Sequence, residues 1–168
     1  MADKEILMSG RAEARRFGDR FALEKRERPG LFSGNMKIIS ASVRTSRPAP
    51  ADWMTGAAWL DEIAGPDDAP GNARVARVTF SPGARTHWHT HPCGQILHVL
   101  SGAGRAQKFG EPVREIFPGD TVFIAPGEKH WHGAGPSRLM AHLAVQEADS
   151  AGQTTHWLEP VSDAEYAA

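Results

Sequence analysis

The chain has 168 residues, of which 40 % are hydrophobic and 23 % charged, as expected for a globular protein long enough to bury one core. Its formal net charge of -1, without a dominant basic block, argues against nucleic acid as a partner. A single cysteine, Cys93, excludes an internal disulfide, and no apolar run suits a signal peptide or a membrane span, so we expect a cytoplasmic protein.

The beginning of the chain differs in composition from the rest. The stretch RAEARRFGDRFALEKRER is rich in charged residues and helix formers, and it stops at a Pro-Gly pair. One interpretation is a short helix with Phe17, Phe21 and Leu23 facing inward, and the other is a loosely packed extension. We therefore predict an N-terminal extension over residues 1–35, partly helical or disordered, and one domain over residues 36–168.

From Met36 onward the pattern is that of short β-strands. The runs are rich in Val, Ile and Phe, and turns such as SPGA, HPCG, FPGD and APGEKH separate them. This spacing predicts an all-β domain, a sandwich or barrel, with no long amphipathic helix between residues 36 and 158. The last run also suits a helix by composition, but its position after a series of strands favours a strand. The expected strands are MKIISASVRT, ARVARVTFS, QILHVLSG, VREIF, DTVFIA and RLMAHLAVQE.

Four of the chain's eight histidines lie in the stretch GARTHWHTHPCGQILHVLSG, and three of them alternate at His87, His89 and His91. Side chains two residues apart share a face of a regular strand, so a regular strand here would place three imidazoles on one side. Surface histidines or hydrogen-bonded core histidines are the alternative interpretation. His130, within APGEKHWH, favours a metal site, because imidazole is the commonest side-chain ligand of transition metals.

The spacing of the first histidine stretch resembles the first motif of the cupin family. In order it reads Gly83, five residues, His89, one residue, His91, three residues, Gln95, six residues and Gly102. The family usually has Glu where this chain has Gln95. His87 matches no position of the motif.

A second stretch resembles the second cupin motif. Gly119, the APG turn and His130 occur in the expected order, although Ala125 and Ala134 replace the usual Pro and Asn. The resemblance implies a single double-stranded β-helix, or jelly-roll, barrel. It also implies four metal ligands that converge inside the barrel, namely His89, His91, Gln95 and His130.

Longer segments resemble one cupin subgroup, the bacterial hydroxynitrile lyases of the (R)-mandelonitrile lyase type. They are PADWMTG, VTFSPGARTHWHTHPCGQ, PGDTVFIAPGEKHWHGA, AHLAVQE and VSDAEY. The resemblance implies one divalent transition metal ion, manganese first, with iron, zinc, nickel and cobalt as alternatives. Because Gln95 is neutral, the ion would keep its full charge, which favours Lewis-acid chemistry over oxygen activation. A purely structural Gln95 without metal is the other interpretation.

Strand alternation and the same resemblance assign further roles. His142 and Gln146 share a face of the expected strand RLMAHLAVQE, and the resemblance directs that face to the metal. On ARVARVTF, the resemblance places Ala76 and Val78 near the substrate. A neutral imidazole, His142 first and His132 second, would take the substrate's proton. Gln146 would hydrogen-bond the departing cyanide.

The predicted function is a metal-dependent lyase that cleaves or forms cyanohydrins from a small-molecule substrate. Lys129 would attract cyanide near the rim, or else it is an exposed turn lysine without a specific role. The alternatives are a cupin oxygenase or polyketide cyclase acting on a small aromatic substrate, and a non-catalytic cupin that binds a small molecule. No membrane partner is expected. Tryptophans outside the pocket, and the habit of small cupins to pair, predict a homodimer or a multiple of it.

Overall fold

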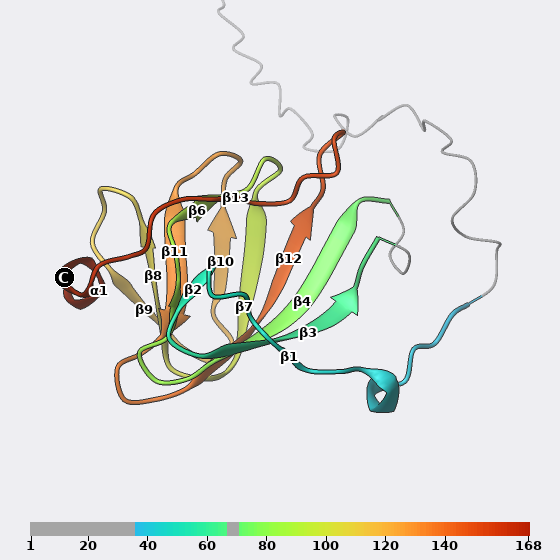
Figure 1. Ribbon diagram of the computed structural model, residues 1–168, viewed down its shortest axis with the longest axis horizontal. Helices are drawn as coiled ribbons and strands as arrows, with labels where there is room; N and C mark the ends of the chain where they lie inside the picture. The colour runs from blue at the N-terminus through green and yellow to red at the C-terminus, as the bar shows by residue number, and fades with distance from the viewer. Residues whose placement is uncertain (1–35, 67–70) are drawn as a thin grey trace, which may run out of the picture. The chain divides into compact units, whose positions relative to one another are not determined.

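The computed structural model describes residues 36–66 and 71–168, and their regular secondary structure is almost entirely β-strand (Figure 1). The helix considered near the start of the chain lies outside them, and the division at residue 35 stays a prediction. No helix in the described ranges is long and apolar enough to cross a membrane. The one α-helix found there is α1 (Asp163–Ala167), near the C-terminus.

Six strands form the first sheet, sheet A, in the order β1-β3-β4-β12-β7-β10. All of its neighbouring strands pair antiparallel. Their bounds are β1 (Arg47–Pro48), β3 (Ala58–Ala64), β4 (Ala73–Phe80), β12 (Met140–Glu147), β7 (Gln95–Gly102) and β10 (Thr121–Ile124).

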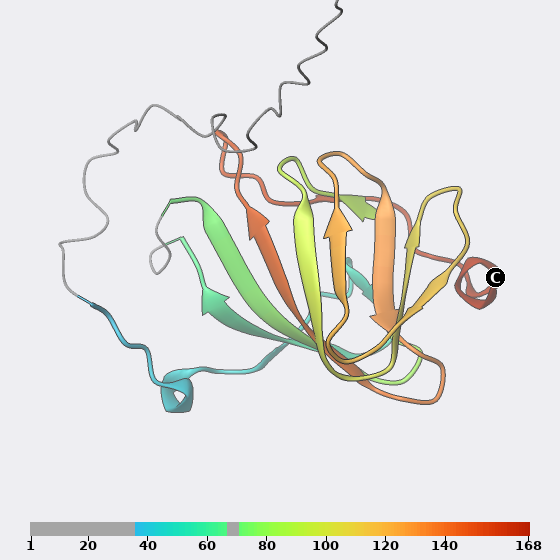
Figure 2. The ribbon, with the colours of Figure 1, turned by 180° about the vertical axis from the view of Figure 1, so that it is seen from behind.

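The second sheet, sheet B, has the order β13-β6-β11-β5-β2, with β8 beside β11 and β9 beside β8. Its bounds are β2 (Met54–Thr55), β5 (Arg85–Thr86), β6 (His89–Thr90), β8 (Gly104–Lys108), β9 (Arg114–Ile116), β11 (His130–Ala134) and β13 (His156–Trp157). Figures 1 and 2 show the two sheets facing each other. The predicted all-β jelly-roll fold is confirmed.

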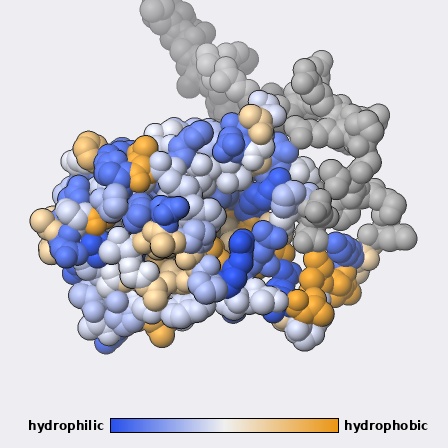
Figure 3. All heavy atoms as spheres, in the orientation of Figure 1, coloured by the Kyte–Doolittle hydropathy of each residue, from blue (hydrophilic) through white to orange (hydrophobic). Residues whose placement is uncertain are grey.

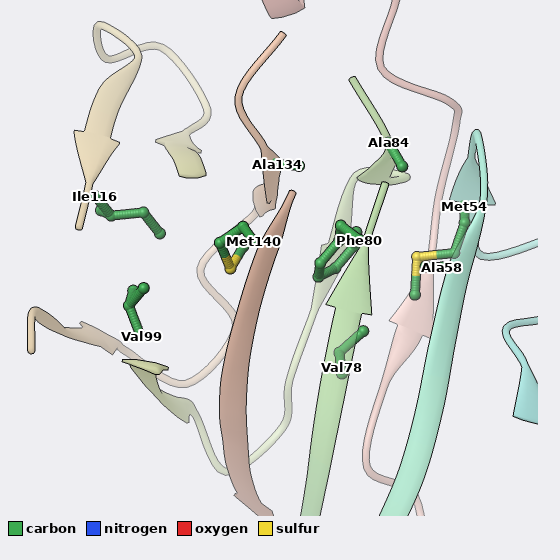
Figure 4. Close-up of a cluster of buried hydrophobic side chains, with 9 residues drawn as sticks. All are labelled: Met54, Ala58, Val78, Phe80, Ala84, Val99, Ile116, Ala134 and Met140. Carbon is green, nitrogen blue, oxygen red and sulfur yellow. The ribbon is translucent and has the colours of Figure 1, made fainter. Parts of the chain in front are cut away.

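Alternating side chains fill the space between the sheets. Along β7, Leu97 and Val99 are buried whereas Ile96 and Leu100 face outward, as the two-residue period of a strand requires. The main apolar cluster joins both sheets and is drawn in Figure 4. It consists of Met54, Ala58, Val78, Phe80, Ala84, Val99, Ile116, Ala134 and Met140.

Two glycines, Gly94 and the motif glycine Gly102, serve the turns at either end of β7. Gly94, directly before Gln95, has φ +80°, and Gly102, the last residue of the strand, has φ +83°. Side chains rarely adopt such φ values. A Cβ at Gly102 would also collide with the backbone of Leu139. These two glycines therefore determine where β7 begins with Gln95 and where it ends.

One predicted strand is wrong. MKIISASVRT forms no strand, and its only regular element is a 3₁₀-helix, η1 (Ala41–Val43), where the Ser40 hydroxyl accepts a hydrogen bond from the Ser42 amide. Met36, Ile38 and Val43 are 90 %, 84 % and 70 % exposed, and this segment forms the orange surface at the lower right of Figure 3. Its apolar composition suits a strand, but no neighbouring strand within the described residues pairs with it.

The alternating histidine stretch is not one regular strand either. Arg85–Thr86 and His89–Thr90 belong to separate strands, and the chain bends at Trp88 between them. The amide of His87 donates to the Trp53 carbonyl at 2.8 Å, outside the regular ladders. The bend interrupts the common face that a regular strand would give His87 and His89.

Candidate metal and active site

Three of the predicted metal ligands enter the interior from sheet B. His89 begins β6, His91 directly follows that strand, and His130 begins β11. β6 and β11 pair antiparallel with His89 opposite His130, and the centroids of these rings lie 4.1 Å apart. The ring of His91 lies 5.0 Å from that of His89 and 5.4 Å from that of His130. Strand pairing thus joins residues of the two sequence motifs.

Backbone carbonyls determine which nitrogen of each ring faces the interior. In each ring Nδ1 donates to a carbonyl oxygen, and the pairs are His89 with His87 (2.9 Å), His91 with Thr154 (2.7 Å) and His130 with Glu128 (2.8 Å). A carbonyl oxygen only accepts, so the proton is on Nδ1 and a neutral ring presents an unprotonated Nε2. Metal-binding histidines are commonly oriented by such a bond.

Burial keeps these imidazoles neutral. Desolvation lowers the pKa of His130 to about 4, and it lowers the pKa of His91 as well. The pKa of His89 lies well below its ordinary value, first because of burial and then because of the neighbouring His130 and His91. Since a metal binds the neutral ring, all three are in the binding form at neutral pH.

Unsatisfied nitrogens indicate that the site fits a metal ion. Nε2 of His91 and Nε2 of His132 are buried without a hydrogen-bond partner among the described residues. Such atoms are costly unless a ligand satisfies them. Ligand nitrogens of His89, His130 and His132 lie within 4.8 Å of one another, close enough to share one ion. His132, expected from the sequence as a proton acceptor, therefore lies close to the same space as the predicted ligands.

Gln95, the fourth predicted ligand, is the first residue of β7 and comes from sheet A. Its Oε1 lies 3.3 Å from Nε2 of His130. Its Nε2 donates to Oε1 of Gln146 on β12 at 2.7 Å, and these two residues are also cross-strand partners. Because Gln146 accepts this bond, the carbonyl oxygen of Gln95 is the atom turned toward the histidines.

His132 and His142 form a buried pair behind the ligands. Nε2 of His142 and Nδ1 of His132 lie 3.2 Å apart. Burial lowers the pKa of His142 to about 4, and burial followed by the neighbouring His142 and His89 lowers the pKa of His132 strongly. Both rings are therefore neutral. Only His132 of this pair lines the neighbouring cavity, whereas His142 lies behind it.

The cavity beside the histidines has a volume of about 390 Å³. Ala76 and Val78 line it, in the places that the resemblance implies for substrate contacts. Two aromatic residues were not anticipated as pocket walls: Trp53 and Trp157 stack with centroids 5.1 Å apart and both line the cavity. Trp157 lies on β13, which pairs with β6, so its ring also lies 4.7 Å from that of His89.

Lys129 contacts residues that do not line the histidine cavity. Its ammonium pairs with the carboxylate of Glu159 and lies over the rings of Phe109 and Trp88, 4.2 and 5.2 Å from their centroids. Lys129 is not one of the residues that line the cavity of the histidines. Its predicted attraction for cyanide stays a prediction.

A two-sheet β-barrel with converging histidines defines a class of metal-binding jelly-roll proteins. The chain matches the cupin domain over residues 76–144. It is also 49 % identical over 131 residues to the (R)-mandelonitrile lyase of Granulicella tundricola, which covers 78 % of this chain and 98 % of that enzyme. The chain belongs to the cupin family.

Solved structures agree with this assignment. A cupin-like protein from Thermotoga maritima has 39 % sequence identity and a TM-score of 0.66, covering 71 % of this chain and 89 % of that one. The polyketide cyclase RemF from Streptomyces resistomycificus has a TM-score of 0.63 at 18 % identity, covering 79 % of this chain and 91 % of that one. The second likeness concerns the fold alone.

Proposed function

We propose that this cupin is a metal-dependent hydroxynitrile lyase that cleaves and forms cyanohydrins. The observation that carries the proposal is the set of buried, neutral histidines whose Nδ1 atoms are held by carbonyls, so that each presents an unprotonated Nε2 to the interior. The 49 % identity to a lyase supports the same reaction class. A divalent ion on His89, His91, Gln95 and His130 would supply Lewis acidity toward the cyanohydrin oxygen.

The two buried histidines are suited to accept the substrate's proton. We infer that His132 is the acceptor and His142 its partner, the reverse of the order expected from sequence, because only His132 lines the cavity. With the proton of His132 on Nδ1 and directed to Nε2 of His142, at 3.2 Å, Nε2 of His132 is free to accept another. His142 then stabilises the imidazolium.

The remaining residues act on the departing group and the substituent. As the carbon–cyanide bond breaks, its electron pair leaves with cyanide and the oxygen's former O–H pair forms the carbonyl. Nε2 of Gln146 is available to donate to cyanide, because its Oε1 is occupied by Gln95. Ala76 and Val78 leave room for the substituent, and Trp53 offers it an aromatic wall. His132 returns the proton to cyanide.

The test combines elemental analysis with mandelonitrile cleavage and oxygen uptake on one preparation. We expect cleavage without oxygen consumption, and loss of cleavage in His132→Ala with metal content retained. Oxygen consumption would favour the oxygenase alternative. Tight retention of a small molecule, with no turnover and no effect of His132→Ala, would favour the binding protein.

We propose manganese as the resident metal and a homodimer as the assembly. The outer face of sheet A supports the second proposal, because Phe123 is 75 % exposed and Ile96 and Leu100 lie on the same face. Elemental analysis of purified protein tests the first proposal. Light scattering at working concentration tests the second, and a monomer would contradict it.

A further inference from the structure

The cavity beside the histidines does not end at the substrate-sized space. A second chamber of about 330 Å³ adjoins it. The two chambers have several wall residues in common, so they lie side by side along the same part of the barrel. The shared residues are Trp53, Leu60, Ala76, Ala144, Gln146 and Thr154. We call the second space the outer chamber.

A row of polar residues leads from the candidate metal site to the outer chamber. Gln95 on β7 is the cross-strand partner of Gln146 on β12, and Gln146 is the cross-strand partner of Arg74 on β4. Adjacent strands are about 4.8 Å apart, so the Cα atoms of Gln95 and Arg74 are separated by roughly 10 Å. Arg74 thus stands two strands away from Gln95, a separation on the order of the length of one substituted aromatic ring.

The charge of the outer chamber is positive. Its lining residues include two that carry a positive charge, Arg47 and Arg74, and one that carries a negative charge, Glu62. Arg74 is half-buried, and Nη1 donates to the carbonyl of Ala73. Within residues 36–66 and 71–168, the guanidinium of Arg47 has neither a hydrogen bond nor an ion pair. An apolar stretch with Leu60, Ala76 and Ala144 separates this charge from the neutral histidines.

We propose that the outer chamber is an anion subsite, in which Arg47 and Arg74 bind a carboxylate at the far end of the substrate. A guanidinium matches a carboxylate with paired hydrogen bonds, and the apolar wall strengthens that attraction by excluding water. The proposal rests on the proposed function for the reacting end. The natural substrate is then a carbonyl compound or its cyanohydrin that carries a carboxylate about one ring away from the reacting carbon.

Calorimetric binding tests this without requiring turnover. The probes are 4-formylbenzoate and 4-formylbenzamide, which have nearly the same shape but differ in charge, each titrated into metal-loaded protein. We expect the benzoate to bind at least tenfold more tightly than the amide. This preference should disappear in the Arg47→Gln/Arg74→Gln double variant and be partly kept in Arg74→Lys. Equal binding of the two probes, or an unchanged preference in the double variant, would overturn the proposal.

A matched control is available on the same strand. Arg77 lies on β4 but is exposed and pairs with Asp61 rather than lining either chamber. Arg77→Gln should keep the wild-type preference, and Glu62→Gln should increase it by removing the chamber's carboxylate. Preference for the benzoate without any mandelonitrile cleavage would refute the lyase function and leave the subsite. Mandelonitrile cleavage without a preference for the benzoate would refute the anion subsite and leave the lyase function.

Discussion

Replacing Gln146 by Leu tests how the metal ligands are oriented. Oε1 of Gln146 accepts the 2.7 Å hydrogen bond from Nε2 of Gln95, and no other partner of that donor is found among the described residues. Removing one partner of a buried hydrogen bond costs about 1–3 kcal/mol. Gln146 is only half-buried, so water can partly replace it, and the lower part of that range applies. The dissociation constant for manganese should therefore rise about tenfold.

The measurement is competition with a chelator of known affinity, and it does not depend on any enzymatic activity. Gln146→Glu keeps an acceptor for Gln95, so it should bind metal at least as tightly as the wild type. Glu147→Gln changes the exposed neighbouring residue and serves as the control. If the Leu variant bound manganese as tightly as the wild type, Gln146 would not orient Gln95 and the neutral-ligand geometry would need another explanation.

Three further predictions concern the same buried cluster. His89→Ala and His130→Ala should each lose most of the metal by elemental analysis while retaining the β-sheet signal in circular dichroism, and full occupancy in both would exclude this site. Metal-free protein should lose stability as the pH falls from about 6.5 toward 4. The folded-state pKa of His142 is about 4 and its ordinary value is 6.5, so the unfolded chain binds the proton first. Its contribution, on the order of 3 kcal/mol, is complete above pH 6.5 and lost through that window. Denaturant midpoints across the window check this, and His142→Gln should flatten the dependence. Gln95→Glu should bind metal well yet cleave mandelonitrile more slowly.

The places of Gln95 and His130 at the start of their strands were predictable, because short-range turn geometry determines where each strand begins. Gly94 and the motif glycine Gly102 have positive φ at either end of β7, so the turn signals around this run mark the strand that begins with Gln95. The strand over RLMAHLAVQE was predicted from its place after a turn at the end of a series of strands, although its composition also suits a helix, and it pairs with β4 and β7 as β12. Spacing between neighbouring turn signals therefore predicts local structure reliably.

Other features depend on contacts between distant segments. Trp53 and Trp157 stack although the chain separates them widely, and nothing local distinguishes a pocket-wall tryptophan from a core one. Which of His132 and His142 lines the cavity was likewise unpredictable. Strand alternation shows which face of a strand a side chain is on, but not whether it reaches the cavity. The strand predicted for MKIISASVRT does not form, for a related reason. Its composition suits a strand, but a strand also requires a neighbouring strand to pair with.

The Gln95→Glu variant separates two effects of the ligand carboxamide. Glu has no N–H to donate, so two oxygens would face each other where Gln95 now donates to Gln146. The simplest relief is rotation of the Gln146 amide, which would donate Nε2 to Glu and turn Oε1 toward the cavity. Cyanide then loses its donor, while the added carboxylate lowers the Lewis acidity of the bound ion. Both effects slow cleavage. The double variant Gln95→Glu/Gln146→Lys separates them, because Lys at position 146 can donate both to the new carboxylate and to cyanide. It therefore relieves the loss of the donor but not the loss of Lewis acidity. Cleavage by Gln95→Glu at the wild-type rate would contradict both effects and with them the role assigned to the neutral ligand.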